Sequence, residues 1–170
     1  MSRGLFIGRF QPFHKGHLYA IQKILEQEDE IVIGIGSSQQ SYTVDNPLTA
    51  GERYEIVRAV LIDQKIWHRS YIITIPDIWE NAVWPARVIE YSPTFDRVYT
   101  GNNLVELLFK RFNVPVVRIE HINRENYQGK TIREKILKGE EWENLVPDIV
   151  LDYLRKFNFV NRIKYLATKW

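Results

Sequence analysis

The sequence predicts an α/β fold, namely a single Rossmann-like, doubly wound parallel sheet with helices on both faces and an expected strand order of 3-2-1-4-5. Three observations predict it. Short β-branched runs alternate with longer stretches of helical spacing. A glycine-punctuated loop follows the first of these runs. The 170-residue chain has no repeat, low-complexity tract or linker that would divide it.

The first part of the chain supplies two strands and two helices. Residues 5–8 form the expected first strand, and the helix after its loop has apolar residues at helical spacing. Residues 31–35 form the second strand. Thr49 and Glu52 then have the spacing of a capping box, so we assign them to the start of the next helix.

The middle of the chain continues the alternation. Residues 71–75 form the third expected strand, which Pro76 closes. A helix is expected over residues 81–90, and residues 97–100 form the fourth strand. Asn102 is placed to cap the helix that follows.

The last part adds one strand and further helices. Residues 114–119 form the fifth strand, and the Thr131 to Glu134 segment has the pattern of a second capping box opening a helix. Residues 146–157 complete the set, and residues 161–170 are expected to be a docked tail.

Composition indicates one domain over residues 1–170, in which the last helices (about 146–170) pack as a C-terminal extension. The 23 basic and 21 acidic residues leave a net charge of +2, so no overall field favours nucleic acid or a membrane surface as a partner. The apolar runs are strand-sized, and no signal-peptide pattern is present. The absence of cysteine excludes disulfides and thiolate metal sites, and fits a cytoplasmic setting.

The loop after the first strand has the features of a phosphate site. In the expected strand order, ligands bind between the first and fourth strands, which brings residues 8–17 beside residues 101–103. Helix starts favour anions because their N–H groups are free. His14 and His17 are three residues apart at such a start, so both rings face one side, and Gly16 between them leaves room for a ligand.

Two other interpretations of the histidine pair stay open. In one, the rings of His14 and His17 only cap and solvate the helix, which is the usual role of an isolated pair at this spacing. A zinc site needs further ligands, and His68 and His121 are the only other histidines in a chain without cysteine. We therefore expect no metal held by the protein.

Residues 8–17, Gly-Arg-Phe-Gln-Pro-Phe-His-Lys-Gly-His, resemble the signature of the HxGH nucleotidyltransferase superfamily. With residues 35–39, 46–53, 76–78 and 100–103, the chain is similar to the archaeal-type nicotinamide-nucleotide adenylyltransferases over nearly its whole length. The resemblance implies transfer of the adenylyl group of ATP to nicotinamide mononucleotide (NMN), with NAD and pyrophosphate as products. The attack of the NMN phosphate on the α-phosphorus would be direct and in line.

Such a transfer needs positioning and charge stabilisation more than a strong base, because the acceptor phosphate is ionised at neutral pH. The resemblance implies catalytic roles for His14, His17, Arg9 and Arg133. The ATP-binding residues that it implies are Gly8, Arg9, Phe10, His14, Gly16, His17, Gly101, Asn102, Lys130, Thr131 and Arg133.

Arg133 lies in a segment that departs from the family pattern. Gln128 and Lys130 stand where relatives usually have small hydroxyl residues, and Lys130 adds a positive charge instead. The alternative for Arg133 is an exposed helix arginine paired with Glu134. Its place in the first helical turn favours a bound anion, because a lone cation there opposes the helix dipole.

The resemblance implies an acceptor pocket in which Asp77 and Asn81 hydrogen-bond the nicotinamide carboxamide and Trp84 stacks on its ring. An aromatic face and a carboxylate both suit a flat cationic pyridinium. We place these three residues on one helical face, at spacings of four and three. Ser37 and Gln39 are candidates for the acceptor phosphate. The alternatives are a loop role for Asp77 and a core role for Trp84.

The resemblance also implies partners. Mg²⁺ is expected as a cofactor carried with ATP, and the chain is expected to form a homo-oligomer, a hexamer by family resemblance. Two rival functions remain. One is another HxGH transferase, with phosphopantetheine or a flavin nucleotide as acceptor or a cytidylyl donor. The other is a noncatalytic sensor of ATP or NAD.

Overall fold

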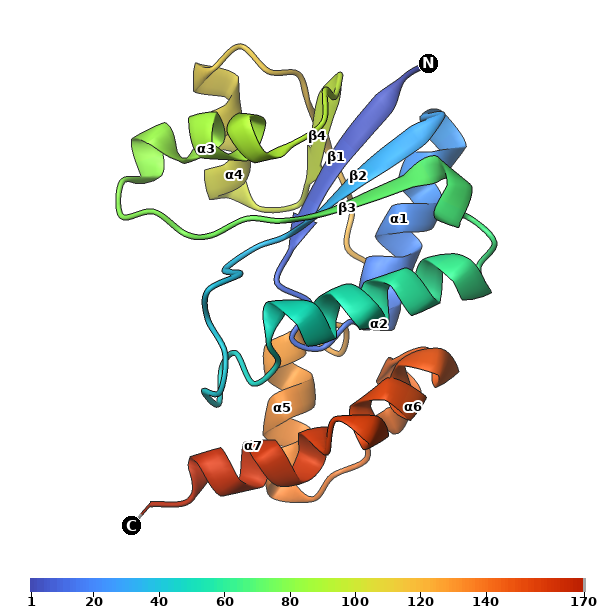
Figure 1. Ribbon diagram of the computed structural model, residues 1–170, viewed down its shortest axis with the longest axis vertical. Coiled ribbons are helices and arrows are strands. Elements are labelled where there is room, and N and C mark those ends of the chain that lie inside the picture. The colour runs from blue at the N-terminus through green and yellow to red at the C-terminus, as the bar shows by residue number, and fades with distance from the viewer. Residues whose placement is uncertain (170) are drawn as a thin grey trace.

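A five-stranded parallel sheet runs through the computed structural model, which describes residues 1–169 (Figure 1). The strand order is β3-β2-β1-β4-β5, and every neighbouring pair is parallel, so the predicted order is confirmed. The strands are β1 (Arg3–Gly8), β2 (Glu30–Ile35), β3 (Ser70–Thr74), β4 (Arg97–Thr100) and β5 (Val116–Arg118).

Helices connect the strands and cover both faces. The α-helices are α1 (Lys15–Gln27), α2 (Ala50–Asp63), α3 (Trp84–Tyr91), α4 (Asn103–Arg111), α5 (Gly129–Lys138), α6 (Asp148–Lys156) and α7 (Phe159–Ala167). Three short 3₁₀ turns are η1 (Trp67–Arg69), η2 (Asn81–Val83) and η3 (Glu143–Leu145). None of the helices in residues 1–169 has both the length and the apolar composition needed to cross a bilayer.

Alternate residues of the central strands pack into two separate hydrophobic cores, one on each face of the sheet. Leu5 and Val32 pack in a smaller cluster with residues of α3 and α4. Ile31 and Ile33 point the other way, into a larger cluster with residues of α1, α2 and α5 to α7. Figure 1 shows α1 and α2 on one side of the sheet and α3 and α4 on the other. This division follows from the period of two along each strand.

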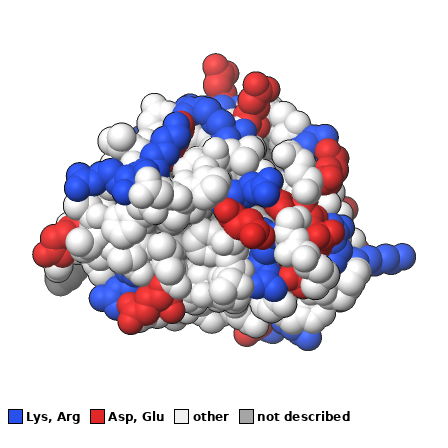
Figure 2. Space-filling model, turned by 90° about the horizontal axis from the view of Figure 1, so that it is seen from above, with Lys and Arg blue, Asp and Glu red and all other residues white. Residues whose placement is uncertain are grey.

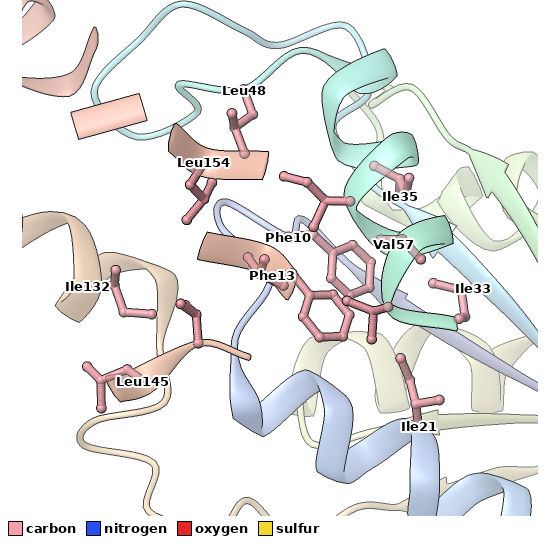
Figure 3. Packing of buried hydrophobic residues seen from close by; sticks show 14 of the residues in the cluster. Phe10, Phe13, Ile21, Ile33, Ile35, Leu48, Val57, Ile132, Leu145 and Leu154 are labelled. Carbon is pink, nitrogen blue, oxygen red and sulfur yellow. The ribbon is translucent and has the colours of Figure 1, made fainter. Parts of the chain in front are cut away.

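The larger cluster continues from the sheet into the loop after β1 and the C-terminal helices. Phe10 and Phe13 of that loop are stacked and buried, with Leu154 of α6 among their neighbours in the same cluster (Figure 3). α6 packs against α2, and α7 packs against α5. The loop that begins the predicted phosphate site is therefore held in the core rather than lying free on the surface.

Two predicted helix caps are confirmed. The Thr49 hydroxyl accepts from the Glu52 N–H (3.1 Å) and the Glu52 carboxylate accepts from the Thr49 N–H (2.9 Å), which is the expected capping box. The Asn102 side chain accepts from the N–H groups of Leu104 and Val105 at the start of α4. Each cap satisfies backbone donors that would otherwise lack a partner.

Two local predictions are wrong. The helix expected from Thr131 begins earlier, at Gly129, and the Thr131 hydroxyl donates to the Glu125 carbonyl oxygen instead of capping. The second concerns the expected docked tail: residues 161–167 do dock, but as part of α7 rather than as a tail, since Phe159 and Ile163 lie one helical turn apart and are both buried. Trp170, the end of the expected tail, lies outside the described residues.

Charged residues of both signs share the surface. On the face seen in Figure 2, Lys and Arg side chains lie next to Asp and Glu in several places, around a central area of uncharged residues. This distribution fits the near-balance of charge in the sequence.

Candidate active site

A cavity of about 620 Å³ opens at the carboxyl ends of β1, β4 and β5, which is where the strand order predicted a ligand site. Three loops line it: the loop after β1, the loop after β4, and the long connection from β5 to α5. Of the predicted ATP-binding residues, those in its lining are Gly8, Arg9, Phe10, His14, Gly16, His17, Gly101, Asn102, Lys130 and Arg133. Thr131 is the one that does not line it.

His14 and His17 form a reciprocal pair at the start of α1. The His17 N–H donates to Nδ1 of His14 (3.3 Å), and the His14 N–H donates to Nδ1 of His17 (3.1 Å). The rings are stacked with centroids 3.6 Å apart. Since both Nδ1 atoms accept hydrogen bonds, each neutral ring carries its proton on Nε2. Both histidines thus cap the helix, as that interpretation expected, and the capping leaves two Nε2–H donors for a ligand.

Both imidazoles are held in the neutral form. Burial, with the added effect of His121, lowers the pKa of His14 from 6.5 to about 3. Burial also lowers the pKa of His17 well below its usual value, and the neighbouring His14 and His121 add to the effect. The pair therefore meets an anion at neutral pH as hydrogen-bond donors rather than as cations.

These shifts predict a pH-dependent stability. Below pH 6.5 the unfolded chain protonates His14, whereas the folded chain does not do so until about pH 3. The unfolded state therefore binds more protons in this window, and stability falls as the pH falls. Denaturant unfolding between pH 7 and pH 5 should show a slope of up to about 1.4 kcal/mol per pH unit from this group.

The control for this prediction is His14→Asn, which keeps a side-chain acceptor at the helix start but has no titrating ring. Its stability should vary less with pH than that of the wild type over the same range. Equal slopes for the two proteins would show that His14 is not held neutral by the fold.

Gly16 allows the histidine pair to pack against the loop before α5. A Cβ atom at this position would lie 2.9 Å from Nδ1 of His14 and 2.9 Å from Cβ of Tyr127. We therefore expect Gly16→Ala to displace the His14 ring and to lower kcat by roughly tenfold or more, because such sites tolerate little misplacement. Steady-state kinetics would measure this.

The matched control is Gly51→Ala in α2, where the new Cβ would have only a 3.9 Å contact with the Thr49 hydroxyl. It should leave turnover unchanged and raise helix stability slightly. A Gly16→Ala protein with the kinetics of the control would contradict the packing argument.

Arg133 is buried, so the alternative of an exposed arginine paired with Glu134 is wrong. Its Nη1 donates to the Gln11 carbonyl oxygen (2.6 Å), and its Nη2 lies 3.7 Å from a carboxylate oxygen of Asp45. Glu134 pairs with Lys130 instead, at 3.9 Å. Burial lowers the pKa of Arg133, and the positive charge of Arg9 lowers it further. Two guanidinium groups thus share one cavity, an arrangement that an anion would stabilise.

Gln11 orients other residues of the site, a role that its place in the sequence did not indicate. Its buried side chain donates to the Leu48 carbonyl oxygen and accepts from the Leu48 N–H, both at 2.9 Å. These bonds fix the loop after β1 to the segment before α2. The Gln11 carbonyl oxygen then holds Arg133, so one residue orients both sides of the cavity.

The end of β5 and the connection from β5 to α5 contribute cavity residues that were not predicted from the sequence. Arg118, His121 and Arg124 all line the cavity. Arg118 is held by Glu106 and by the Asn103 side chain (2.6 Å). The His121 ring lies over Gly101, where a Cβ would approach its Nε2 to 2.0 Å. Applying the strand-end rule to the fifth strand as well as to the first and fourth would have indicated them.

Three of the predicted acceptor residues lie together at the ends of β2 and β3. The Ser37 hydroxyl and the Gln39 amide donate to the Asp77 carboxylate (3.1 and 3.3 Å), and the Asp77 N–H donates to the Gln39 side-chain oxygen (3.0 Å). The cavity of about 620 Å³ does not include these residues in its lining. They form a separate polar cluster at the same edge of the sheet.

Asn81 and Trp84 are not part of that hydrogen-bonded cluster. The proposed common helical face is wrong, because Asp77 lies in an irregular segment, Asn81 in η2 and Trp84 at the start of α3. Asn81 is exposed. Trp84 is half-buried, and its ring packs edge-on against Phe109 with the centroids 5.7 Å apart. The alternative of a core role therefore holds for the buried part of the Trp84 side chain, while the rest of the side chain is exposed.

The cytidylyltransferase-like family matches residues 5–135. A nicotinamide-nucleotide adenylyltransferase of Methanococcus vannielii is 49% identical over 167 residues, covering 98% of this chain and 96% of the relative. Enzymes of the same name from Thermoplasma acidophilum and Pyrococcus horikoshii are each 44% identical, over 98% and 99% of this chain and 93% and 90% of their own lengths.

A solved structure gives the same fold at low sequence identity. A bifunctional NMN adenylyltransferase/ADP ribose pyrophosphatase from Francisella tularensis, complexed with AMP and a manganese ion, superimposes with a TM-score of 0.71 at 19% identity. The match covers 99% of this chain and 57% of that one, so the chain spans little more than half of the bifunctional protein. At this identity the likeness supports the fold alone.

Proposed function

The chain belongs to the nicotinamide-nucleotide adenylyltransferases of the cytidylyltransferase-like family, and from this we propose that it transfers the adenylyl group of ATP to NMN. NAD and pyrophosphate are the products. The observation that carries the proposal is the convergence of the paired imidazoles with Arg9 and Arg133 on one cavity at the strand ends.

We propose that the triphosphate of ATP lies across the start of α1. The Nε2–H groups of His14 and His17 donate to its oxygens, and the guanidinium groups of Arg9 and Arg133 offset its negative charge. As the NMN phosphate attacks, charge moves to the equatorial and leaving oxygens. Fixed donors that already point there stabilise that charge without reorganising.

We propose that NMN binds beyond the carboxyl ends of β2 and β3. The cluster of Ser37, Gln39 and Asp77 supplies hydroxyl, amide and carboxylate groups there, and the carboxylate favours a cationic pyridinium. The exposed Asn81 amide suits the nicotinamide carboxamide, and the open part of the Trp84 ring suits stacking on the pyridinium. With ATP at β1 and β4, the two phosphates would meet above β1.

We propose that Mg²⁺ arrives as part of the ATP substrate. The charged side chains that line the cavity are basic, and the others include amides and imidazoles, so they suit the phosphate oxygens directly. A cation bridging phosphate oxygens keeps several of its waters and needs few protein ligands. The Francisella tularensis protein, which has the same fold, was likewise found with a divalent cation, manganese.

The test is NMN-dependent release of pyrophosphate from ATP in the presence of Mg²⁺. Phosphopantetheine, flavin mononucleotide and nicotinic acid mononucleotide serve as competing acceptors, and CTP as a competing donor. A preference for phosphopantetheine over NMN, or for CTP over ATP, would reject the assignment. A protein that binds NAD tightly but releases no pyrophosphate would be the sensor rather than the enzyme.

We propose further that the chain works as a homo-oligomer, a hexamer by family resemblance. Apolar side chains exposed on α3 and α4 support an assembly surface, among them Ile89, Leu104 and Leu107. Light scattering coupled to size-exclusion chromatography would measure the assembly. The cytoplasmic setting stays a prediction of the sequence.

A further inference from the structure

Arg53 of α2 is fully buried, yet it forms no ion pair with any carboxylate in residues 1–169. Its guanidinium donates only to backbone carbonyl oxygens. The acceptors are those of Arg9 (3.0 Å), Gly36 (2.8 Å), Ser37 (3.1 Å), Gln40 (3.3 Å) and Thr49 (3.2 Å). A buried charge with this partner set is costly, so its retention calls for a specific role.

The five carbonyl groups come from two loops and a helix start. Arg9 lies in the loop after β1, which we call the ATP loop (residues 9–14), and residues 36–40 form the acceptor loop after β2. Nη1 bridges the two loops, because it donates to both Arg9 and Gly36. Arg53 is therefore a direct link between the residues assigned to ATP and those assigned to NMN.

Both loops have unusual backbone conformations next to the bonded carbonyl groups. Phe10, the residue after Arg9, has a φ of 53°, and Ser37 has a φ of 47°. Residues other than glycine rarely adopt a positive φ, so the surrounding structure must hold the backbone of Phe10 and Ser37 in this conformation. The hydrogen bonds from Arg53 to Arg9 and Ser37 supply part of that restraint.

The charge of Arg53 interacts with charged residues of both substrate sites, Arg9 and Asp77. Burial and the charge of Arg9 together lower the pKa of Arg53 to about 10, and the charge of Asp77 opposes the shift. Asp77 accepts hydrogen bonds from the acceptor loop, through Ser37 and Gln40. The guanidinium thus lies within electrostatic reach of one charged group from each substrate site.

We propose that Arg53 is a positioning residue that fixes the ATP loop and the acceptor loop relative to each other, so that the two substrates meet in line. The inference rests on the proposed function. Only arginine suits the task, because its planar fork reaches several carbonyl groups at once, whereas a lysine presents three donors from a single nitrogen.

The test is Arg53→Lys, which keeps the charge and loses the fork. We expect kcat to fall roughly 10–100-fold, because a small misalignment of the reacting groups has effects of this size. The Kd of ATP alone and the KM for NMN should each change by less than about tenfold, since each loop still binds its own substrate.

Two matched arginine-to-lysine variants separate positioning from general stability. Arg58 is on the same helix but exposed, over the ring of Trp67, so Arg58→Lys should leave kcat and Tm unchanged. Arg162 binds Glu52 and the Pro47 carbonyl oxygen near the start of α2, so Arg162→Lys should lower Tm with little change in kcat. Wild-type kcat in Arg53→Lys would overturn the proposal. So would an equal loss of kcat in Arg162→Lys at an equal loss of Tm.

Failure of the proposed function can be told apart from failure of this inference. A wild-type chain that releases no pyrophosphate from ATP and NMN rejects the function, and amide hydrogen exchange then tests Arg53. The N–H groups of Gly36, Ser38 and Gln40 are hydrogen-bonded and should exchange slowly. Arg53→Lys should accelerate their exchange and Arg162→Lys should not; unchanged exchange in Arg53→Lys overturns the inference.

Discussion

Replacing His17 with alanine should lower turnover about 10²–10³-fold while the chain still folds. His17 supplies an Nε2–H donor at the start of α1, and the orientation of that donor depends on the bond that Nδ1 accepts from the His14 N–H. Loss of a preorganised donor to developing charge has an effect of this size. Pyrophosphate release at saturating ATP and NMN is the measurement.

The variant also removes one of the two hydrogen bonds of the capping box of α1, the one that His17 accepts from the His14 N–H, and the contact of the His17 ring with Phe10, whose centroids are 4.5 Å apart. Two controls separate these effects from catalysis. Thr49→Ala removes the cap of α2 and should cost about 1 kcal/mol of stability, with turnover retained. His68→Ala removes an exposed histidine of η1, outside the cavity lining. Wild-type turnover in His17→Ala would disprove the role given to this ring.

Replacing Arg133 with methionine should lower kcat/KM for ATP by about 10²-fold or more, because a buried guanidinium in the cavity is lost together with its charge. The Gln11 carbonyl oxygen would also lose its partner, at a cost of roughly 1–3 kcal/mol in stability. Arg133→Lys should recover only part of the activity, since an ammonium cannot bind Gln11 and a phosphate with a planar fork. Kinetics and urea unfolding on both variants would measure the two effects.

The control for Arg133 is Lys135→Met on the same helix. Lys135 pairs with Glu140 at 3.7 Å and is not in the cavity lining, so its loss should change neither kcat nor KM. If Arg133→Met lost stability but kept wild-type kcat/KM, Arg133 would be a structural residue that only holds Gln11.

Local patterns in the sequence predicted the fold well, because each depends on neighbours along the chain. Thr49, Glu52 and Asn102 cap the helices that they were expected to cap, and the alternation of strands and helices led to the observed strand order. The predicted box at Thr131 fails because the segment just before it offers another hydrogen-bond acceptor. Its hydroxyl has a nearby carbonyl acceptor at Glu125, and the helix starts two residues before it.

The site was predicted where one continuous motif defines it and missed where distant segments meet. Residues 8–17 were sufficient to place the histidine pair in the cavity. The bonds of Arg53 to Arg9 and Ser37, and of Gln11 to Leu48, join residues that are 16 to 44 positions apart, and no spacing rule indicates them. The same limit applies to Asp77 and Trp84, whose spacing suggested a shared helix that the chain does not form.

For the proposed reaction, a single polyphosphate must contact both imidazoles and both guanidinium groups at once. A crystal structure of the chain with Mg²⁺ and a nonhydrolysable ATP analogue tests it directly. We predict phosphate oxygens within hydrogen-bond distance of Nε2 of His14 and His17, with the guanidinium groups of Arg9 and Arg133 against the same triphosphate. A nucleotide bound elsewhere, or a triphosphate that leaves the two Nε2 atoms without a partner, would contradict it.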